Sequence, residues 1–282
     1  MVENRMLTAK QVEQYVAWLG REERSKGTRE KYQRDLTEFR TWLHGMCVDK
    51  ERVTQWKHQL LEQGYAPVTV NSKLAALNGF FRYAHWEDCV VKYVKIQRKL
   101  FRESDRELTR RDYEKLLGTA ARLGRSRLEL LLESMAATGV RVSEVRYLTV
   151  EAARQGRAEV SLKGKIRVIL IPSKLCRKLL KYAKQCNIRS GEIFITRTGK
   201  SLSRRQIWAE MKALCEKAGV EPSKVFPHNL RHLFATVFYR SSKDISKLAD
   251  VLGHSSIETT RIYLIASQRQ HARYLEGLGF VS

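Results

Sequence analysis

Four short segments in the second half of the 282-residue sequence carry side chains that could act together on a phosphodiester. Each segment sets a basic or polar side chain beside a signal for a turn or a helix start. Pro227, for example, suits the first position of a helix and would place His228 and Arg231 on one face, three residues apart. The candidates are Arg141 in ATGVRVSEVRYL, Lys163 in SLKGKIRV, His228 and Arg231 in PHNLRHLFAT, and His254 and Tyr263 in VLGHSSIETTRIYL.

These residue types suit phosphoryl transfer without a metal. Two guanidiniums can bind the non-bridging oxygens of a phosphodiester bidentately, and they keep their charge at any cellular pH. Histidines can donate hydrogen bonds or move a proton near neutral pH, and a lysine can protonate the leaving oxygen. A tyrosine hydroxyl is a competent covalent nucleophile, and its phosphotyrosine ester keeps the bond energy for rejoining. The sequence shows no Asp/Glu cluster typical of a two-metal nuclease and no GxxxxGK[ST] motif, so we expect neither a metal nor a cofactor.

Each segment has a simpler interpretation when it is taken alone. An arginine after a glycine is usually a surface or capping residue, and Lys163 at a hairpin tip would ordinarily be a solvated charge. A single HxxR pair is more often structural than catalytic, and Tyr263 within RIYL would ordinarily be a core residue. The occurrence of all four segments in one chain and in this order favours a shared site.

The charge of the chain indicates a polyanionic partner. Lys and Arg number 53 against 30 Asp and Glu, which gives a formal net charge of +23 and a pI near 10.0. Residues 1–90 hold 14 basic and 12 acidic side chains, whereas the remainder holds 39 and 18. This asymmetry favours a nucleic acid bound mainly by the second part of the chain, and the charge alone does not separate DNA from RNA.

The composition argues against several other classes of protein. Hydrophobic residues make up 43% of the chain, which predicts a globular protein, and the length suffices for two domains. No apolar run is long enough to span a membrane, and the start MVENRMLTAK lacks the apolar core of a secretory signal. The five cysteines are scattered and include no CxxC pair, so neither a zinc site nor a disulfide framework is indicated. We therefore expect a cytoplasmic protein that associates with no membrane.

Residues 1–90 are predicted to form a bundle of amphipathic helices. Thr8 and Gln11 can form a capping box, Asp49 can cap a later helix, and Pro67 can open another. Apolar residues then recur at helical spacing. The helices are expected at 10–19, 28–43, 50–64 and 67–86. Four aromatic side chains are expected in the core of this bundle rather than on a base-stacking surface, namely Trp18, Trp42, Trp56 and Phe80.

A charged segment at 91–107 is predicted to be a linker, and residues 108–282 a second domain that is mainly helical with one small antiparallel sheet. Its two strands are AEVSLK and IRVILIP, joined by a tight turn at Gly164. Gly139 should end one helix and Arg141 should lie at the opening of the next, with Glu144 one turn on to hold its guanidinium. Helices are expected at 110–123, 126–139, 175–183, 204–219, 228–241, 244–252 and 257–278.

The ordered motifs resemble the tyrosine recombinase (integrase) family. The resemblance lies in ATGVRVSEVRYLT, HNLRHLFAT and LGHSSIETTRIY, together with the hairpin lysine between them. TREKYQRDLTEF and VTVNSKLAALNGFFRYA resemble the family's helical, SAM-like core-binding domain, so the resemblance covers nearly the whole chain. The short hairpin turn favours Lys163 over Lys165 as the general acid. The resemblance implies Tyr263 as the nucleophile and an activating set of Arg141, Lys163, His228, Arg231 and His254.

The same resemblance implies a site-specific DNA recombinase whose two domains close on duplex DNA as a C-shaped clamp. Such an enzyme cuts one strand through a 3′-phosphotyrosyl link and rejoins it to the 5′-hydroxyl of a partner strand. It implies paired recombination half-sites and a homotetramer on DNA, joined through the C-terminal helix, although that helix could instead fold back on its own domain. We expect no separate arm-binding domain before residue 8, as in the two-domain form of the family.

Several biological roles are compatible with that chemistry. Integration or excision of a mobile element is the role we expect, because LIAS follows Tyr263 where members that resolve chromosome dimers commonly have THV. Chromosome-dimer resolution is the first alternative. A DNA-relaxing topoisomerase of similar chemistry is a second, against which the tail SQRQHARYLEGLGF argues because it resembles the segment that recombinases pass to a neighbouring protomer. A DNA-binding protein without catalysis is a third.

Overall fold

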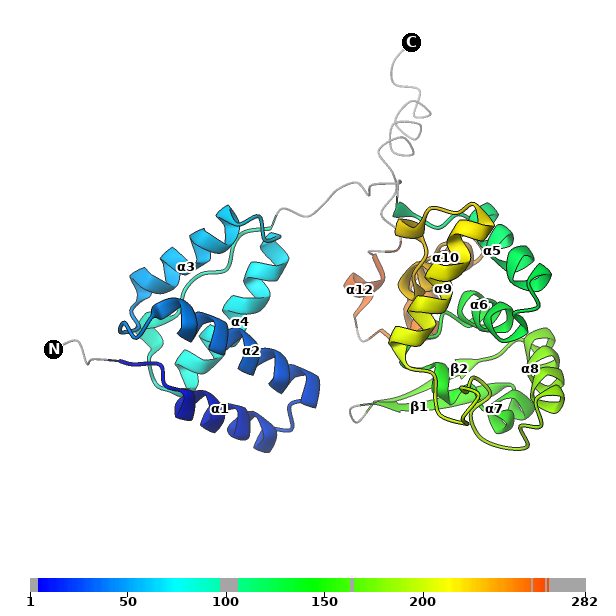
Figure 1. The fold of residues 1–282 in the computed structure, drawn as a ribbon, viewed down its shortest axis with the longest axis horizontal. Coiled ribbons are helices and arrows are strands. Elements are labelled where there is room, and N and C mark those ends of the chain that lie inside the picture. The colour runs from blue at the N-terminus through cyan, green and yellow to red at the C-terminus, as the bar shows by residue number, and fades with distance from the viewer. Residues whose placement is uncertain (1–4, 97–105, 163–164, 255, 262, 264–282) are drawn as a thin grey trace, which may run out of the picture. The chain divides into compact units, whose positions relative to one another are not determined.

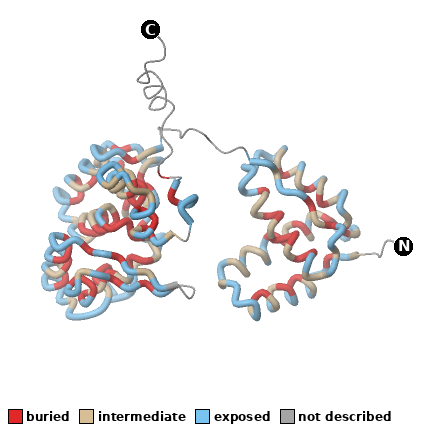
Figure 2. The backbone as a smooth tube through the Cα atoms, turned by 180° about the vertical axis from the view of Figure 1, so that it is seen from behind, coloured by how far each residue is buried: buried red, intermediate tan, exposed pale blue. Residues whose placement is uncertain are grey.

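The chain divides into two compact units, Met1–Arg98 and Lys99–Ser282 (Figure 1). The computed structural model describes residues 5–96, 106–162, 165–254, 256–261 and 263. Each unit has its own buried interior, and Figure 2 shows buried residues along the chain within each of them. Within the described ranges, no helix has the length and apolar character needed to cross a membrane. The predicted fold class, mainly helical with a small antiparallel sheet in the second part, is confirmed.

The first unit contains the four predicted helices. The capping box at the first helix forms as predicted, with Gln11 N donating to the Thr8 hydroxyl. Asp49 caps the third helix by accepting from Arg52 N at 2.7 Å, and Pro67 is the first residue of the fourth. The helices are α1 (Ala9–Arg21), α2 (Lys26–Leu43), α3 (Lys50–Glu62) and α4 (Pro67–Tyr83), followed by a short 3-10 helix, η1 (Glu87–Cys89).

Aromatic side chains fill the interior of this bundle, as the sequence predicts. Trp56 and Phe80 are buried, while Trp18 and Trp42 pack against the same cluster from partly exposed positions. Phe39 lies fully buried between Trp42 and Trp56, with ring centroids 5.8 and 5.0 Å away. The aromatic residues therefore stabilise the bundle and are not arranged on its surface as a stacking platform.

The segment after η1 is held against the bundle by two asparagines of α4. Asn78 donates to the carbonyl of Val91 and accepts from its N–H, at 2.9 and 3.1 Å. Asn71 does the same for Val94, at 2.9 and 2.7 Å. These side chains satisfy the backbone N–H and carbonyl groups of Val91 and Val94, which belong to no helix or strand, and Val91 is buried. Residues 91–94, which we expected to begin the linker, thus pack with the first unit.

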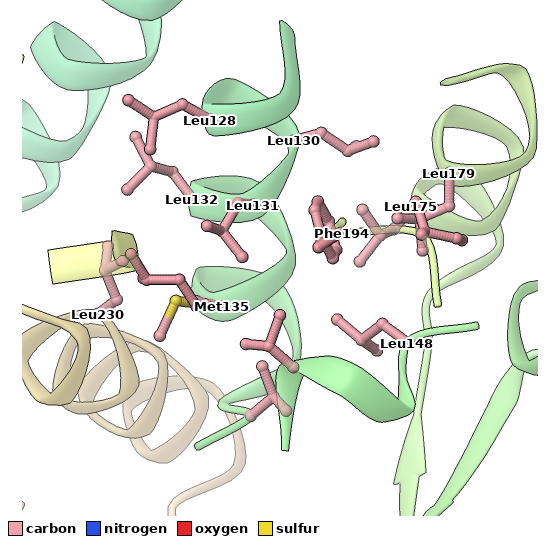
Figure 3. Packing of buried hydrophobic residues seen from close by; sticks show 14 of the residues in the cluster. Leu128, Leu130, Leu131, Leu132, Met135, Leu148, Leu175, Leu179, Phe194 and Leu230 are labelled. Atoms are coloured by element: carbon pink, nitrogen blue, oxygen red, sulfur yellow. The ribbon is translucent and has the colours of Figure 1, made fainter. Parts of the chain in front are cut away.

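The second unit is built around one central helix. Helix α6 (Ser126–Thr138) packs against α5 (Arg110–Arg122), α8 (Ser173–Gln185) and α10 (Pro227–Ser242) (Figure 1). Its side chains Leu131 and Met135 are fully buried among Leu148, Phe194 and Leu230 (Figure 3). The remaining elements are η3 (Val145–Tyr147), α7 (Val150–Gln155), α9 (Arg204–Ala218), η4 (Pro222–Lys224), α11 (Ile245–Leu252) and α12 (Ile257–Arg261).

The sheet is a single antiparallel pair, β1 (Arg157–Leu162) and β2 (Lys165–Leu170), as predicted. Alternation along β2 turns Arg167 and Ile169 inward, while Ile166, Val168 and Leu170 are exposed. Arg167 therefore occupies an inward-facing position of β2. The predicted turn at Gly164 lies outside the described residues, as does the part of the last predicted helix beyond residue 263.

The segment after α6 differs from the prediction. Helix α6 ends at Gly139 as expected, but Arg141 lies in a turn that leads into the 3-10 helix η3 and does not open a new α-helix. The reason is local. The Glu144 carboxylate accepts from the backbone N–H of Arg141 at 2.9 Å, so a side chain satisfies the donor and fixes a tight turn.

Replacing Gly139 by alanine is expected to destabilise the fold strongly. Gly139 has φ +61°, and a methyl group there would lie 2.5 Å from the Phe234 ring and 3.1 Å from Leu252. We expect a loss of about 2–4 kcal/mol in the free energy of unfolding, from backbone strain and overpacking together. Gly219→Ala is the matched control, because Gly219 has φ +59° with open space around it. The Gly219→Ala variant should lose about 1 kcal/mol in the free energy of unfolding. Equal losses for the two variants, measured by urea denaturation, would contradict this account.

Candidate active site

The structure brings five of the six candidate side chains to one place on the second unit. Arg231 Nη2 lies 2.9 Å from His254 Nε2. The rings of His254 and Tyr263 are stacked, with centroids 5.8 Å apart and an interplanar angle of 11°. The His228 ring also lies 5.8 Å from Tyr263, tilted by 35°. Arg141 lies close enough to Arg231 for their charges to interact. Lys163, the sixth candidate, lies outside the described residues, and nothing is described of the Lys165 side chain.

Two helix ends place these groups. Pro227 opens α10, so His228 and Arg231 lie in its first turns. Helix α11 ends in the left-handed conformation at Gly253, with φ +62°, which turns the chain so that His254 faces Arg231. The Arg167 side chain packs so closely on Gly253 that a methyl group there would overlap it. The glycine is thus needed for both its conformation and its lack of a side chain.

Arg231 is buried, and its guanidinium joins three parts of the site. It donates from Nη1 to the carbonyl of Gly139, and from Nη2 to the carbonyl of Leu252 at 2.8 Å and to His254. Burial lowers the pKa of Arg231, and the positive charge of Arg141 lowers it further, while a hydrogen bond with Tyr263 opposes that shift. The guanidinium stays charged and is fixed in orientation by backbone acceptors before any substrate binds.

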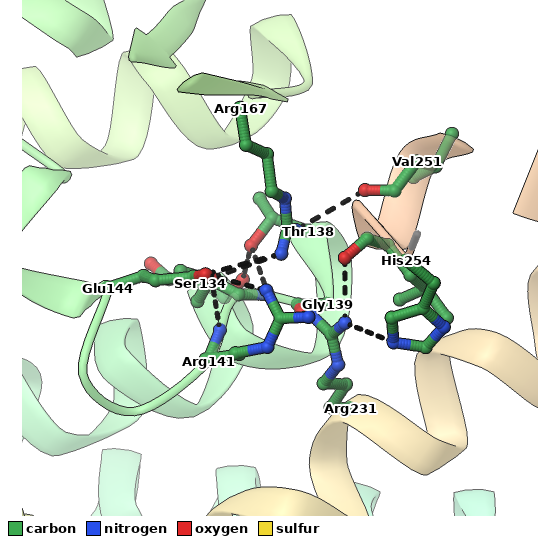
Figure 4. Close-up of polar contacts among 11 residues, drawn as sticks. Ser134, Thr138, Gly139, Arg141, Glu144, Arg167, Arg231, Val251 and His254 are labelled. Carbon is green, nitrogen blue, oxygen red and sulfur yellow. Dashed lines mark hydrogen bonds and ion pairs between the residues drawn. The ribbon is translucent and has the colours of Figure 1, made fainter. Parts of the chain in front are cut away.

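A second network, centred on the Glu144 carboxylate, holds the Arg141 side chain in place (Figure 4). The buried carboxylate of Glu144 accepts from Arg141 Nη1 at 2.7 Å and from Arg167 Nη1 at 3.2 Å. Arg167 Nη2 also reaches the carbonyl of Val251 at 3.3 Å. Burial lowers the pKa of Arg167 to about 10, although the Glu144 carboxylate opposes the shift. The Arg141 guanidinium is therefore fixed through Nη1 by Glu144. The side chain is still 39% exposed, so its other N–H groups are open to a ligand.

His254 is neutral in this arrangement. Its Nδ1 lies 2.9 Å from Thr260 Oγ1, and its Nε2 faces Arg231. Burial lowers the pKa of His254 to about 4, and the nearby positive charges of Arg231, Arg141 and Arg167 add to the effect. A protonated ring would direct an N–H at a guanidinium, so the uncharged form fits the contact.

Tyr263 is both a packing residue and a site residue. Its side chain is only 5% exposed and joins a small apolar cluster with Ala235, Leu248 and Leu252, distinct from the main core of the unit. Its hydroxyl also lies near enough to Arg231 to oppose the lowering of the pKa of that guanidinium. The Tyr263 ring can therefore be buried while its hydroxyl lies beside Arg231.

Three further residues of the site were missed by reasoning from the sequence. Arg167 could have been found as an arginine at an inward position of a strand that otherwise turns apolar residues inward. His232, whose ring centroid lies 5.3 Å from that of Tyr263, follows Arg231 directly. Thr260 precedes Tyr263 by one helical turn, the spacing at which side chains lie on one face.

Acid is expected to destabilise the wild-type fold more than that of a His254→Gln variant. The pKa of His254 falls from 6.5 to about 4 on folding, so at intermediate pH the unfolded chain binds a proton that the folded chain does not. The resulting contribution to stability is present above pH 6.5 and is lost as the pH falls towards 4. Glutamine does not titrate. Melting temperatures at about pH 7.5 and about pH 5 would check this, and an equal decline in both proteins would refute it.

Comparison with known proteins identifies the family. Residues 106–270 match the phage integrase family, and residues 12–88 match the phage integrase N-terminal SAM-like domain. The chain therefore belongs to the phage integrase family of tyrosine recombinases, as the sequence motifs indicate. It is a tyrosine-type site-specific recombinase that breaks and rejoins DNA.

Sequence relatives span almost the whole chain. Tyrosine recombinase XerC of Roseiflexus castenholzii is 32% identical over 278 residues, which cover 90% of this chain and 88% of the relative. Tyrosine recombinase XerD of Pseudomonas aeruginosa is 31% identical over 274 residues, with 88% and 90% covered.

Solved structures share the fold at lower identity. The Tn1549 transposon integrase in complex with circular intermediate DNA has a TM-score of 0.75 at 16% identity, over 96% of this chain and 99% of that one. The XerH site-specific recombinase bound to its difH substrate has a TM-score of 0.69 at 20% identity, with 94% and 84% covered.

Proposed function

We propose that Tyr263 is the nucleophile and that the side chains around it activate one phosphodiester of a recombination site. The Tyr263 oxygen attacks phosphorus and forms a 3′-phosphotyrosyl ester, while the bond from phosphorus to the 5′-oxygen breaks. Arg141 and Arg231 bind the two non-bridging oxygens. His254 lies between Arg231 and the tyrosine ring and orients both.

Two proton transfers complete the step. His228 takes the hydroxyl proton of Tyr263, and Lys163 gives a proton to the leaving 5′-oxygen, which departs as a hydroxyl. Rejoining is the reverse reaction with the 5′-hydroxyl of a partner strand. It releases Tyr263 with its proton and restores the phosphodiester, so no external energy source enters the cycle.

One observation supports this assignment above the others. The Tyr263 ring is stacked on His254, which is bonded to the guanidinium of Arg231. A tyrosine that served only as a core residue would not need its hydroxyl beside a buried guanidinium. The proposed nucleophile, His254 and one phosphate-binding arginine are thus in direct contact in one cluster.

Trapping the covalent intermediate tests the proposal. A duplex with a nick beside the scissile position loses the short strand after cleavage, so the adduct cannot be resealed and accumulates. Digestion of the trapped complex and mass spectrometry of the linked peptide should place the nucleotide on Tyr263. A nucleotide on another residue would refute the assignment, and relaxation of supercoiled DNA without exchange between sites would favour the topoisomerase alternative. Binding with no adduct would favour a silent DNA-binding protein.

We propose integration or excision of a mobile element as the biological role. The LIAS segment after Tyr263 supports it. Resolution of chromosome dimers is the second candidate, favoured by an identity of about 30% to recombinases named XerC and XerD. Sequencing the DNA captured covalently in cells separates the two. Junctions at the ends of a movable segment support the first role, and a single chromosomal site per replicon supports the second.

We further propose that both units bind the same duplex DNA, that paired half-sites assemble four protomers, and that the enzyme works in the cytoplasm on the nucleoid. A lambda integrase fragment of the same fold has been solved as a dimer bound to a core site. The C-terminal segment expected to join the protomers lies outside the described residues. Deleting residues 268–282 should leave half-site binding but prevent recombining tetramers on native gels. Tetramers formed by the truncated protein would exclude this mode of assembly.

A further inference from the structure

Thr260 connects the turn that carries Tyr263 to the imidazole of His254. Its side chain is fully buried, and its Oγ1 lies 2.9 Å from His254 Nδ1. Its backbone carbonyl accepts from the N–H of Tyr263 at 3.0 Å. One residue therefore contacts the nucleophile through its backbone and a neighbouring site residue through its hydroxyl.

The chemistry of the donors fixes the direction of these hydrogen bonds. A guanidinium nitrogen only donates, so in its 2.9 Å contact with Arg231 the Nε2 of His254 must accept. A neutral imidazole that accepts at Nε2 carries its proton at Nδ1. That N–H therefore donates to the hydroxyl oxygen of Thr260. The second neutral tautomer would put an N–H of His254 against an N–H of Arg231, and it would leave Nδ1 without its proton.

We propose that Thr260 is a positioning residue for strand cleavage, because its hydroxyl holds His254 in the tautomer that accepts from Arg231. The inference rests on the proposed role of Tyr263 as the nucleophile. Thr260 also ties that tautomer to the placement of Tyr263, since both bonds start from the same residue. Only when the tyrosine turn is docked does His254 have an acceptor at Nδ1. Correct docking of the nucleophile and correct orientation of the arginine are thus coupled.

A purely structural role makes different demands on Thr260. If burial of its methyl group were its function, valine would replace it at little cost, because valine has nearly the same shape and lacks only the hydroxyl. Serine would be the poorer replacement. Coupling through His254 requires the reverse order, in which serine is tolerated and valine is not. The chain supplies a matched control in Thr259, the preceding residue of the same helix, which is exposed.

The experiment measures the single-turnover rate of adduct formation on the nicked duplex, together with half-site binding. Thr260→Val should slow adduct formation about tenfold to a hundredfold, the usual cost of removing a hydrogen bond that orients a site residue. Its DNA affinity should stay within about twofold, because the phosphate contacts remain. Thr260→Ser and Thr259→Val should keep rates within about threefold of the wild type. In a His254→Ala background, Thr260→Val should cause no further loss, because the partner through which it acts is gone.

Several outcomes would overturn the inference. These are a Thr260→Val rate equal to the wild type, a larger loss with serine than with valine, or an undiminished effect of Thr260→Val in the His254→Ala background. Melting temperatures identify a variant that fails through misfolding, and a slow Thr260→Val with a melting temperature well below that of Thr260→Ser would assign the residue a structural role. Failure of the proposed function would look different, since the wild type itself would then form no adduct on Tyr263.

Discussion

Replacing Tyr263 by phenylalanine is expected to abolish the covalent protein–DNA adduct and leave DNA binding almost unchanged. The substitution removes one oxygen, which is the atom that would join phosphorus. Tyr263 is only 5% exposed, so the packing of its ring with His254 and the small apolar cluster accounts for its contribution to the fold, and phenylalanine keeps that packing. The phosphate contacts of the arginines are also kept, so binding should remain.

Denaturing gels of the reaction on nicked duplex report the adduct, and native gels report binding. Tyr239→Phe is the matched control, because Tyr239 packs against the same small cluster. That variant should form the adduct at the wild-type rate. If Tyr263→Phe still formed an adduct, the nucleophile would be elsewhere, and Tyr274 would be the first residue to test.

Changing Arg141 or Arg231 to lysine is expected to slow adduct formation by on the order of a hundredfold or more. Lysine keeps the positive charge but loses the planar pair of N–H groups that can contact two oxygens at once. The charge that develops on the non-bridging oxygens would then be stabilised at one point only. Affinity for the half-site should change much less, because many other phosphate contacts contribute to it.

The two lysine variants should differ in stability, which makes them informative as a pair. Arg141 is partly exposed and bonded to Glu144, so Arg141→Lys should fold almost as well as the wild type. Arg231 is 3% exposed and donates to the carbonyls of Gly139 and Leu252 from two different nitrogens, whereas lysine offers only one. A buried carbonyl left unsatisfied costs about 1–3 kcal/mol, so Arg231→Lys should also melt at a lower temperature. Wild-type rates in both variants would disprove the proposal that Arg141 and Arg231 bind the non-bridging oxygens.

Much of this fold is readable from local signals in the sequence. Side-chain caps such as Thr8 and Asp49, and the proline at position 67, mark helix starts that the backbone donors require. Helix α7 was missed because its six residues are too few to show a periodic pattern. The docking of residues 91–94 was missed because it depends on Asn71 and Asn78, whose partners lie 13 to 23 positions away.

The candidate site divides in the same way. Its members at turns, such as Arg141 and His254, stand beside glycines that break a helix, and that context is visible in the sequence. Arg167 and Thr260 act through contacts with Glu144 and with His254; strand alternation and helical spacing single out their positions, but the sequence does not reveal these partners. The candidate residues that follow helix-breaking glycines are thus easier to predict than those that orient them, because the contacts of the second group are defined by the folded structure.

The sharing of Glu144 between two arginines has a consequence for the electrostatics of catalysis. In this network, the guanidiniums of Arg141, Arg167 and Arg231 carry three positive charges and the one carboxylate of Glu144 balances a single one. A phosphodiester brings only one negative charge, whereas the pentavalent transition state reached once tyrosine has given up its proton carries two. The described cluster therefore matches the charge of the transition state and exceeds that of the bound diester. Under the proposed mechanism, such a difference lowers the barrier without tightening the ground-state complex, and a ligand bearing two negative charges in that geometry would be held more firmly than the DNA phosphate itself.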